Sequence, residues 1–426
     1  MALGIYISVP FCRTKCTYCN FASGVFSRRR YATYVDSICA DIHNAERTAE
    51  DMDALVESDA DSIYLGGGTP SILERSQLER IFAAINSEFK LSNDSEITVE
   101  CAPGTLSAEL IETLLGCGVN RVSLGVQSFV DEETRAVGRL HTRATVLEDV
   151  ARLRAAGIHN INVDLIAGLP HQTEESWVRS LGDALAIGVP HVSVYMLEVD
   201  EDSRLGKELI AGGKLYHAHF VPDEGLTADL YEIACERLEA AGIEQYEISN
   251  FARAGWRSKH NLKYWTRQPY IGFGVDAHSM LLPNAEVKAA GVNAIRYFWP
   301  DSLEQFLGHG EDREPANEII SELSALEETM FLSLRLNRGL DLCEAERQFG
   351  RDEVAGIADK IADVCNMGLV THEHGILRLT PRGRLLSNEV FEKFVGLRIT
   401  EDELWEFLEA ERLGEESPVP DRGKPH

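Results

Sequence analysis

The sequence lacks a hydrophobic run long enough to cross a membrane. No stretch reaches the ~18 consecutive apolar residues that a transmembrane helix needs. The first nine residues have no basic segment ahead of their short apolar run, and a signal peptide would have one. We therefore expect a cytoplasmic protein that is not itself a membrane protein.

Positive charge is also scarce. The 41 Lys and Arg residues are outnumbered by 69 Asp and Glu residues, which gives a formal net charge of −28. A field of that sign opposes non-specific binding to nucleic acids and to anionic membranes. We therefore expect no nucleic acid among the partners. The same charge also serves solubility alone, so it says little about the substrate.

The nine cysteines do not suggest a disulfide framework in a chain of 426 residues. Three of them, Cys12, Cys16 and Cys19, lie close together directly after the first predicted strand. Three thiolates on one short loop can bind three irons of a 4Fe–4S cubane and leave the fourth iron open to a small molecule. A zinc loop is the alternative, but zinc sites usually carry two cysteine pairs, and this sequence has no second C-x2-C pair.

Strand and helix signals alternate from residue 4 to about residue 200. Short apolar or β-branched runs predict six strands, at residues 4–9, 62–65, 96–101, 121–124, 160–165 and 191–195. Amphipathic helical segments lie between them, for example at residues 77–89. Repeated βα units predict an α/β fold with a parallel sheet. Six units could form a partial, TIM-like (β/α)6 barrel with its chemistry at the carboxyl ends of the strands.

The rest of the chain predicts an extension and a second domain. A strand over residues 270–280 completes a first domain of residues 1–300. Helical segments and a small hairpin in residues 301–398 predict a C-terminal α+β domain of winged-helix type. A DNA-binding role would follow from that pattern, but no basic stripe accompanies it. Residues 399–426 predict an acidic helix and a disordered tail.

A series of motifs in fixed order makes the chain resemble a known family. The series comprises residues 6–21 (YISVPFCRTKCTYCNF), 66–71 (GGGTPS), 100–104 (ECAPG), 121–129 (RVSLGVQSF), 138–141 (GRLH), 162–170 (NVDLIAGLP), 246–253 (YEISNFAR) and 260–265 (HNLKYW). Over about residues 4–395 the chain resembles radical-SAM proteins of the coproporphyrinogen oxidase (HemN) superfamily and, within it, the heme chaperone (HemW) branch. This resemblance implies a radical-SAM barrel, a HemN-type C-terminal domain and a role in porphyrin metabolism.

The resemblance also implies S-adenosyl-L-methionine as the molecule bound beside the cluster. Its implied contacts are Tyr6, Gly67, Gly68, Thr69, Glu100, Gln127, Arg139 and Asp164. Glycines after a strand let a ligand approach the backbone, and a carboxylate can accept hydrogen bonds from ribose hydroxyls or an ammonium group. The last three residues match positions that bind the cosubstrate or a second copy of it. Ordinary surface polar residues are the plain alternative.

Two departures from the oxidase pattern matter. Cys12 is preceded by only eleven residues, and Phe21 stands where the oxidases carry a fourth cysteine. Both departures match the chaperone branch, so we do not expect oxidation of coproporphyrinogen III. An oxygen-independent coproporphyrinogen III oxidase-like protein, or another HemN-like radical-SAM enzyme, stays open as the alternative. Whether the site catalyses a reaction at all also stays open.

If the chain is a heme chaperone, the resemblance implies heme as a further cofactor. We expect His260 to be its anchor, because a neutral imidazole binds heme iron well. Tyr264 and Trp265 offer flat surfaces to a macrocycle. His278 is an alternative ligand, and a surface histidine without a ligand is the plain reading of His260. The resemblance implies a heme acceptor protein, with a respiratory, membrane-associated hemoprotein as the first candidate, and a homodimer stays open.

Overall fold

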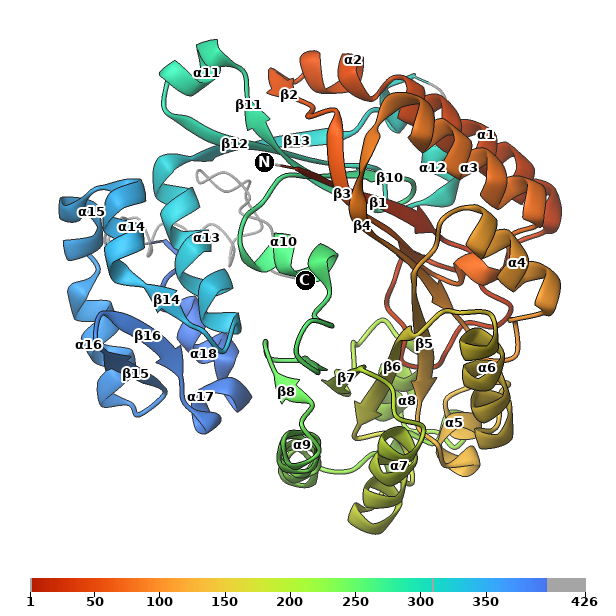
Figure 1. Cartoon of the computed structure of the whole chain (residues 1–426). Coiled ribbons are helices and arrows are strands. Elements are labelled where there is room, and N and C mark those ends of the chain that lie inside the picture. The colour runs from red at the N-terminus through yellow and green to blue at the C-terminus, as the bar shows by residue number, and fades with distance from the viewer. Residues whose placement is uncertain (1, 309, 397–426) are drawn as a thin grey trace. The chain divides into compact units, whose positions relative to one another are not determined.

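A computed structural model describes residues 2–308 and 310–396 (Figure 1). The chain divides into two compact units. The first comprises the residues up to Glu322 together with Arg335–Arg338, and the second comprises Leu323–Leu334 and the chain from Gly339. The domain limits inferred from the sequence stay a prediction. The acidic helix and tail expected at residues 399–426 lie outside the described residues.

The first unit is built on one large sheet whose central strands are parallel. The parallel strands are β1 (Leu3–Val9), β3 (Asp59–Gly67), β4 (Lys90–Cys101), β5 (Arg121–Gln127), β6 (Asn160–Ala167) and β7 (His191–Met196). They lie side by side in this order, and each pairs in parallel with the next. All six strands predicted from the sequence are therefore confirmed, and their carboxyl ends share one edge of the sheet.

Helices connect these strands, and in Figure 1 α1, α3, α4 and α6 follow one another along the outer side of β1 to β5. The connecting helices are α1 (Arg28–His43), α2 (Ala45–Glu50), α3 (Arg75–Glu88), α4 (Ala108–Gly116), α5 (Asp131–Ala136), α6 (Arg143–Ala155) and α7 (Glu174–Ala186). The predicted helix at residues 77–89 is α3, which buries Leu78, Ile81 and Phe82 against the sheet and α1. The βα repeat thus gives the parallel α/β fold that the spacing predicts.

Antiparallel strands extend the sheet on both sides. They are β2 (Ala54–Leu55), β8 (Glu244–Gln245), β9 (Asn250–Ala252), β11 (His278–Pro283), β12 (Val292–Phe298) and β13 (Ala316–Ser321), while β10 (Tyr270–Phe273) pairs in parallel with β1. The single strand expected at residues 270–280 is wrong, since β10 and β11 are antiparallel neighbours. The chain turns at Gly274, where φ is +104° and a Cβ would overlap the Tyr34 hydroxyl.

Shorter helices accompany this extension. They are α8 (Arg204–Ala211), α9 (Glu224–Ala240), α10 (Lys259–Trp265), α11 (Ala285–Ala289) and α12 (Leu303–Phe306), with single 3-10 turns η1 (Pro70–Ile72), η2 (Ala218–Phe220) and η3 (Gly310–Arg313). Within the described residues, every helix is too short or too polar to cross a bilayer. The nine cysteines all lie in the described part of the chain, and none forms a disulfide.

The second unit is a small α+β arrangement. Its elements are most of α13 (Glu322–Arg335), then β14 (Leu340–Asp341), α14 (Leu342–Phe349), α15 (Arg351–Ala355), α16 (Ala358–Asn366), β15 (Val370–Glu373), β16 (Ile376–Leu379), α17 (Pro381–Leu385) and α18 (Ser387–Glu392). The three strands form an antiparallel sheet with β16 in the middle. Leu369 and Leu377 are buried beneath the helices. The predicted winged-helix-like pattern of helices followed by a hairpin is confirmed.

Candidate functional site

The three predicted cluster cysteines lie on the loop that follows β1, and main-chain hydrogen bonds hold this loop. The Cys12 amide donates to the Gly24 carbonyl at 2.9 Å. The Thr17 amide donates to the Val137 carbonyl at 3.2 Å, and the Thr17 carbonyl accepts from the Leu205 amide at 2.8 Å. The loop is thus tied to the chain that follows it, to the segment after β5 and to α8.

The three thiols are partly buried and interact with one another electrostatically. Burial raises the pKa of the Cys12 thiol, and the neighbouring Cys19 and Cys16 raise it further, while a hydrogen bond from Thr69 Oγ1 to Cys12 Sγ at 3.7 Å opposes the rise. Among the described residues, no three His, Cys, Asp or Glu side chains converge tightly enough to hold a single metal ion. A cubane makes a different demand, because each thiolate binds a separate iron.

The glycines at the end of β3 let two segments of backbone meet. The Gly68 amide donates to the Val9 carbonyl at 2.8 Å. A Cβ at Gly68 would lie 2.8 Å from both the Phe11 and Val9 carbonyl oxygens, closer than real Cβ atoms approach. Gly67 has φ +98°, a conformation that residues with a side chain rarely adopt. Glycine is therefore needed here for the end of β3 to lie against the cysteine loop.

A small pocket opens where this glycine segment faces the cysteine loop. Its lining includes Tyr6, Gly67 and Gly68, three of the residues predicted to contact the cosubstrate. Ser8 and Ser23 add hydroxyl groups to the same wall. The pocket thus offers backbone groups, hydroxyls and the two aromatic rings of Tyr6 and Phe21 beside the predicted cluster position.

Glu100, also a predicted contact, is near the end of β4. Its carboxylate accepts a hydrogen bond from the Tyr64 hydroxyl at 2.8 Å and one from the Gly67 amide. Burial raises the pKa of Glu100 to about 7, and the charge of Asp164 adds to the rise. Asp164, on β6, accepts from Ser123 Oγ at 3.0 Å, and burial raises its pKa as well. The site therefore holds two carboxyl groups that a cationic or hydroxyl-bearing ligand would stabilise as carboxylates.

Arg139 brings a positive charge to the cysteine loop. Its guanidinium donates to the Tyr18 hydroxyl at 3.3 Å. Although burial disfavours the charged form, Tyr18 and Cys16 raise the pKa of Arg139, so the side chain stays charged. Its Nε is buried without a hydrogen-bond partner and could donate to an anionic ligand group. Gln127 ends β5 in a left-handed conformation, with φ +66°.

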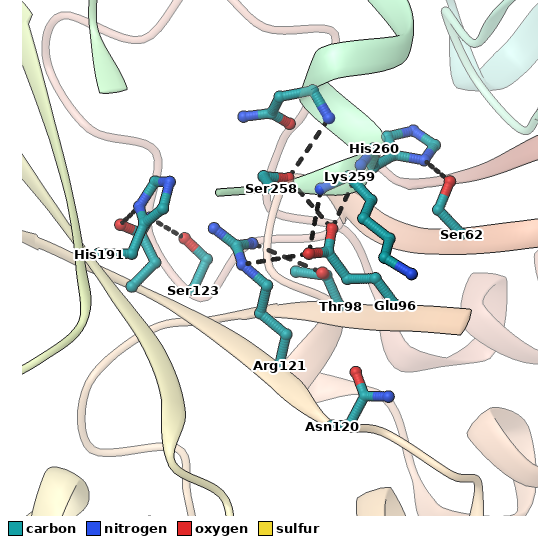
Figure 2. A network of polar contacts seen from close by, with 12 residues as sticks. Ser62, Glu96, Thr98, Asn120, Arg121, Ser123, His191, Ser258, Lys259 and His260 are labelled. Carbon is teal, nitrogen blue, oxygen red and sulfur yellow. Dashed lines mark hydrogen bonds and ion pairs between the residues drawn. The ribbon is translucent and has the colours of Figure 1, made fainter. Parts of the chain in front are cut away.

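His260, the predicted heme anchor, is buried in the first unit with 1% of its surface exposed. Nδ1 is hydrogen-bonded to Ser62 Oγ at 3.0 Å (Figure 2), and Nε2 is bonded to the Tyr264 hydroxyl at 2.9 Å. Burial lowers the pKa of His260 to about 3, and the charges of Lys263 and Arg121 contribute. Heme binding at His260 stays a prediction. Because both ring nitrogens are hydrogen-bonded, heme iron could bind one of them only after that hydrogen bond breaks.

The backbone before His260 explains why this segment is buried. Glu96 on β4 accepts from Ser258 Oγ at 3.1 Å and from the amides of Lys259 and His260 at 3.1 and 3.2 Å (Figure 2). Arg121 Nε lies 4.0 Å from the same carboxylate. A buried carboxylate thus caps the start of α10. Sequence reasoning missed this role, although Ser258 ahead of the helix is an N-cap signal.

His278, the alternative heme ligand, begins β11 and is partly exposed. Its Nε2 lies 3.7 Å from an Asp276 carboxylate oxygen, and its ring stacks on Phe298 with centroids 5.2 Å apart. Trp265 lies under the Arg335 guanidinium, 4.2 Å from ring centroid to Cζ. The structure therefore brings the cluster and cosubstrate residues together, and it places the two heme candidates in different surroundings.

Comparison with known proteins assigns the family. Residues 6–184 match the Radical SAM superfamily, and residues 320–386 match the HemN C-terminal domain. The heme chaperone HemW of Bacillus subtilis is 34% identical over 392 residues, which are 92% of this chain and 98% of that protein. HemW of Lactococcus lactis is 35% identical over 391 residues, 92% of this chain and 96% of that protein. The chain belongs to the heme chaperone HemW family.

HemW membership confirms the branch that Phe21 indicated. A solved structure supports the fold: coproporphyrinogen III oxidase (HemN) from Escherichia coli, a radical SAM enzyme, matches with a TM-score of 0.75. That match has 22% sequence identity and covers 93% of this chain and 90% of the oxidase. The radical SAM family implies a 4Fe–4S cluster and S-adenosylmethionine. The donor set fits both, with three thiols on one loop and an unpartnered buried Arg139 Nε beside them.

Proposed function

We propose that this protein binds a 4Fe–4S cluster through Cys12, Cys16 and Cys19, binds S-adenosylmethionine beside it, and transfers heme to an acceptor hemoprotein. One observation carries the proposal. The ends of β1, β3 and β4 meet at the cysteine loop, where Gly68 bonds to the Val9 carbonyl, Thr69 bonds to Cys12, and the Gly67 amide bonds to Glu100.

The chain's own residues account for binding. When bound, the cluster and the sulfonium cosubstrate supply one-electron chemistry. Gly67 and Gly68 would admit the cosubstrate to backbone groups, with Tyr6 against it. Glu100 would accept hydrogen bonds from its hydroxyl or ammonium groups, and Arg139 would pair with its carboxylate. Gln127, Thr69 and Asp164 would complete the polar shell.

Heme is the cargo in this proposal, and two relatives named heme chaperones support it. A carrier must release what it binds, so we expect moderate affinity or release triggered by the partner. The acceptor we favour is a membrane-associated respiratory hemoprotein. We expect no nucleic-acid partner, given the net charge of −28. A homodimer remains compatible with the proposal.

Anaerobic reconstitution tests the first half. The intact chain should retain iron and sulfide, and a variant with Cys12, Cys16 and Cys19 all replaced by Ser should retain neither. Cys343→Ser is the matched control, because Cys343 is exposed and belongs to the second unit. Equal iron and sulfide in the triple variant would refute the cluster assignment.

Heme titration and product analysis test the second half. The reconstituted chain should show a saturable Soret change with heme and should pass heme to an apo-hemoprotein added at equal concentration. His260→Ala tests the anchor predicted from the sequence. If reductant, S-adenosylmethionine and coproporphyrinogen III instead yield protoporphyrinogen IX, the protein is an oxidase of the HemN type and the chaperone proposal fails.

A further inference from the structure

Three histidines surround one exposed phenylalanine in the first unit, away from the glycine pocket's lining. His171 follows β6, His217 directly precedes η2, and His219 lies within η2. His171 Nε2 and His217 Nδ1 are hydrogen-bonded at 2.9 Å. The Phe220 ring lies with its centroid 4.0 Å from that of His171 and 4.1 Å from that of His219. Neither the cluster site nor α10 uses this group.

A buried carboxylate builds the loop that presents His217. Glu208 of α8 is 8% exposed, and it accepts hydrogen bonds from the amides of Leu215, Tyr216 and Ala218 at 2.7, 2.8 and 3.2 Å. Three charge-assisted bonds to one short loop fix its path. The loop therefore has a defined conformation set by Glu208 of α8. The same helix also contacts the cysteine loop through the Leu205 amide.

The histidine pair has the arrangement of a metal ligand and its orienting partner. When His217 Nδ1 donates its proton to His171 Nε2, His217 Nε2 keeps a lone pair. In the described part of the chain, His217 makes no other side-chain hydrogen bond. Ligating histidines typically donate their second N–H to a neighbouring acceptor, which fixes tautomer and ring orientation. Both residues also have left-handed backbone, with φ +68° at His171 and +61° at His217, and such outliers concentrate at functional sites.

The surroundings favour a porphyrin over a bare ion. No three metal-binding side chains converge on one point among the described residues, but a porphyrin supplies four nitrogen ligands itself and needs only an axial imidazole. Large apolar side chains lie exposed on the same segment: Leu209 (53%), Ile210 (67%), Leu215 (72%) and Phe220 (47%). Lys214 is exposed without an ion-pair partner among the described residues, and can pair with a propionate.

We propose that heme binds on this surface, the α8–η2 patch (Leu209, Ile210, Leu215 and Phe220 with the histidines), with His217 Nε2 as axial ligand and His171 as its positioning residue. The inference rests on the proposed function, since it names where the cargo is held. It places the iron ligand on an accessible loop, whereas His260 is enclosed by two hydrogen bonds. An exposed site suits a cargo that must leave for an acceptor.

Heme titration of the full, anaerobically reconstituted chain tests this assignment. His217→Ala should raise the heme Kd at least about tenfold and change the Soret position, and His171→Ala should raise it about 10- to 100-fold through loss of orientation. Imidazole added to His217→Ala should restore the Soret band. His159→Ala is the matched control, since His159 is an exposed histidine outside the patch. It should bind heme like the intact chain.

Two further measurements separate ligation from surface contact. Iron-free protoporphyrin IX should bind equally to the intact chain and to His217→Ala, because it has no iron to ligate. Leu215→Glu, at a position 72% exposed, should fold normally and should weaken the binding of both porphyrins at least about tenfold, because it places a charge in the apolar surface. Unchanged porphyrin affinity in Leu215→Glu would show that the porphyrin does not cover the patch, and would overturn the proposal.

The outcomes distinguish this inference from the proposed function. If the intact chain shows no saturable heme binding, the chaperone function itself fails. If the intact chain and His217→Ala bind heme alike while His260→Ala does not, the function stands and the patch is wrong. Iron content and thermal unfolding of each variant verify that the folded, cluster-loaded protein is being compared.

Discussion

Gly68→Ala should weaken both the fold and the cluster site, and the structure gives the size of the effect. The new Cβ would lie 2.8 Å from the Phe11 and Val9 carbonyl oxygens and 3.0 Å from the Phe11 amide nitrogen. All three are backbone atoms, so no side-chain rotation relieves the overlap. The cysteine loop must move away from the end of β3.

That movement has two costs. Overpacking by one methyl group typically costs about 1–3 kcal/mol. The Gly68 amide bond to Val9 and the Thr69 amide bond to Phe11, both 2.8 Å long, would lengthen or break, at about 0.5–1.5 kcal/mol each. We expect a loss of about 2–6 kcal/mol in the free energy of unfolding, a large share of the roughly 5–15 kcal/mol of a typical domain.

The assay is urea unfolding of the metal-free chain, followed by iron and sulfide analysis after anaerobic reconstitution. Gly182→Ala is the matched control, because a Cβ there meets nothing within 4 Å and the residue lies inside α7. It should stabilise the protein by about 0.5–1 kcal/mol. If Gly68→Ala unfolds within about 0.5 kcal/mol of the unsubstituted chain and binds full iron, the close-approach argument is refuted.

Two other substitutions test the carboxylates. Because the pKa of Glu100 is raised from 4.5 to about 7 in the folded state, its contribution to the free energy of unfolding is present below about pH 4.5 and is lost as the pH rises through about 7. This loss is at most about 3 kcal/mol, and Glu100→Gln should reduce it when urea unfolding is measured between pH ~5 and ~8. The same pH dependence of stability in Glu100→Gln and in the intact chain would contradict the prediction. Glu96→Gln leaves Arg121 buried beside an uncharged partner and should lower the free energy of unfolding by about 3–5 kcal/mol. Asp94→Asn, at an exposed ion pair with Lys259, is the control and should lower it by less than about 1 kcal/mol. Equal losses of stability in the two variants would argue against a buried network.

Local signals were sufficient for the parallel core. Each central strand is a short apolar or β-branched run bounded by turn residues, and βα repetition fixes strand order and handedness. The same logic placed the cysteine loop, the glycines and Glu100 at one edge of the sheet. Gly274 shows the limit of these local signals, because the apolar run through residues 270–280 continues across the turn that this glycine makes. Only the close approach of Tyr34 shows why the chain bends there.

The environment of His260 could not be read from its own segment. The motif at residues 260–265 combines an imidazole with aromatic rings, which favours a ligand site on local evidence. Its burial depends on Glu96, 164 positions earlier in the chain, and on Ser62 from β3. Such long-range pairing leaves no mark in the sequence of a single chain. The α8–η2 patch escaped notice for the same reason, since His171 and His217 are 46 positions apart.

The bonds that hold the cysteine loop also bear on how the protein matures. Its amides and carbonyls are engaged by Gly24, Val137 and Leu205, which belong to three other segments of the chain. Because these bonds restrict the loop, less conformational entropy is lost when iron and sulfide bind than with an unrestrained loop of the same length.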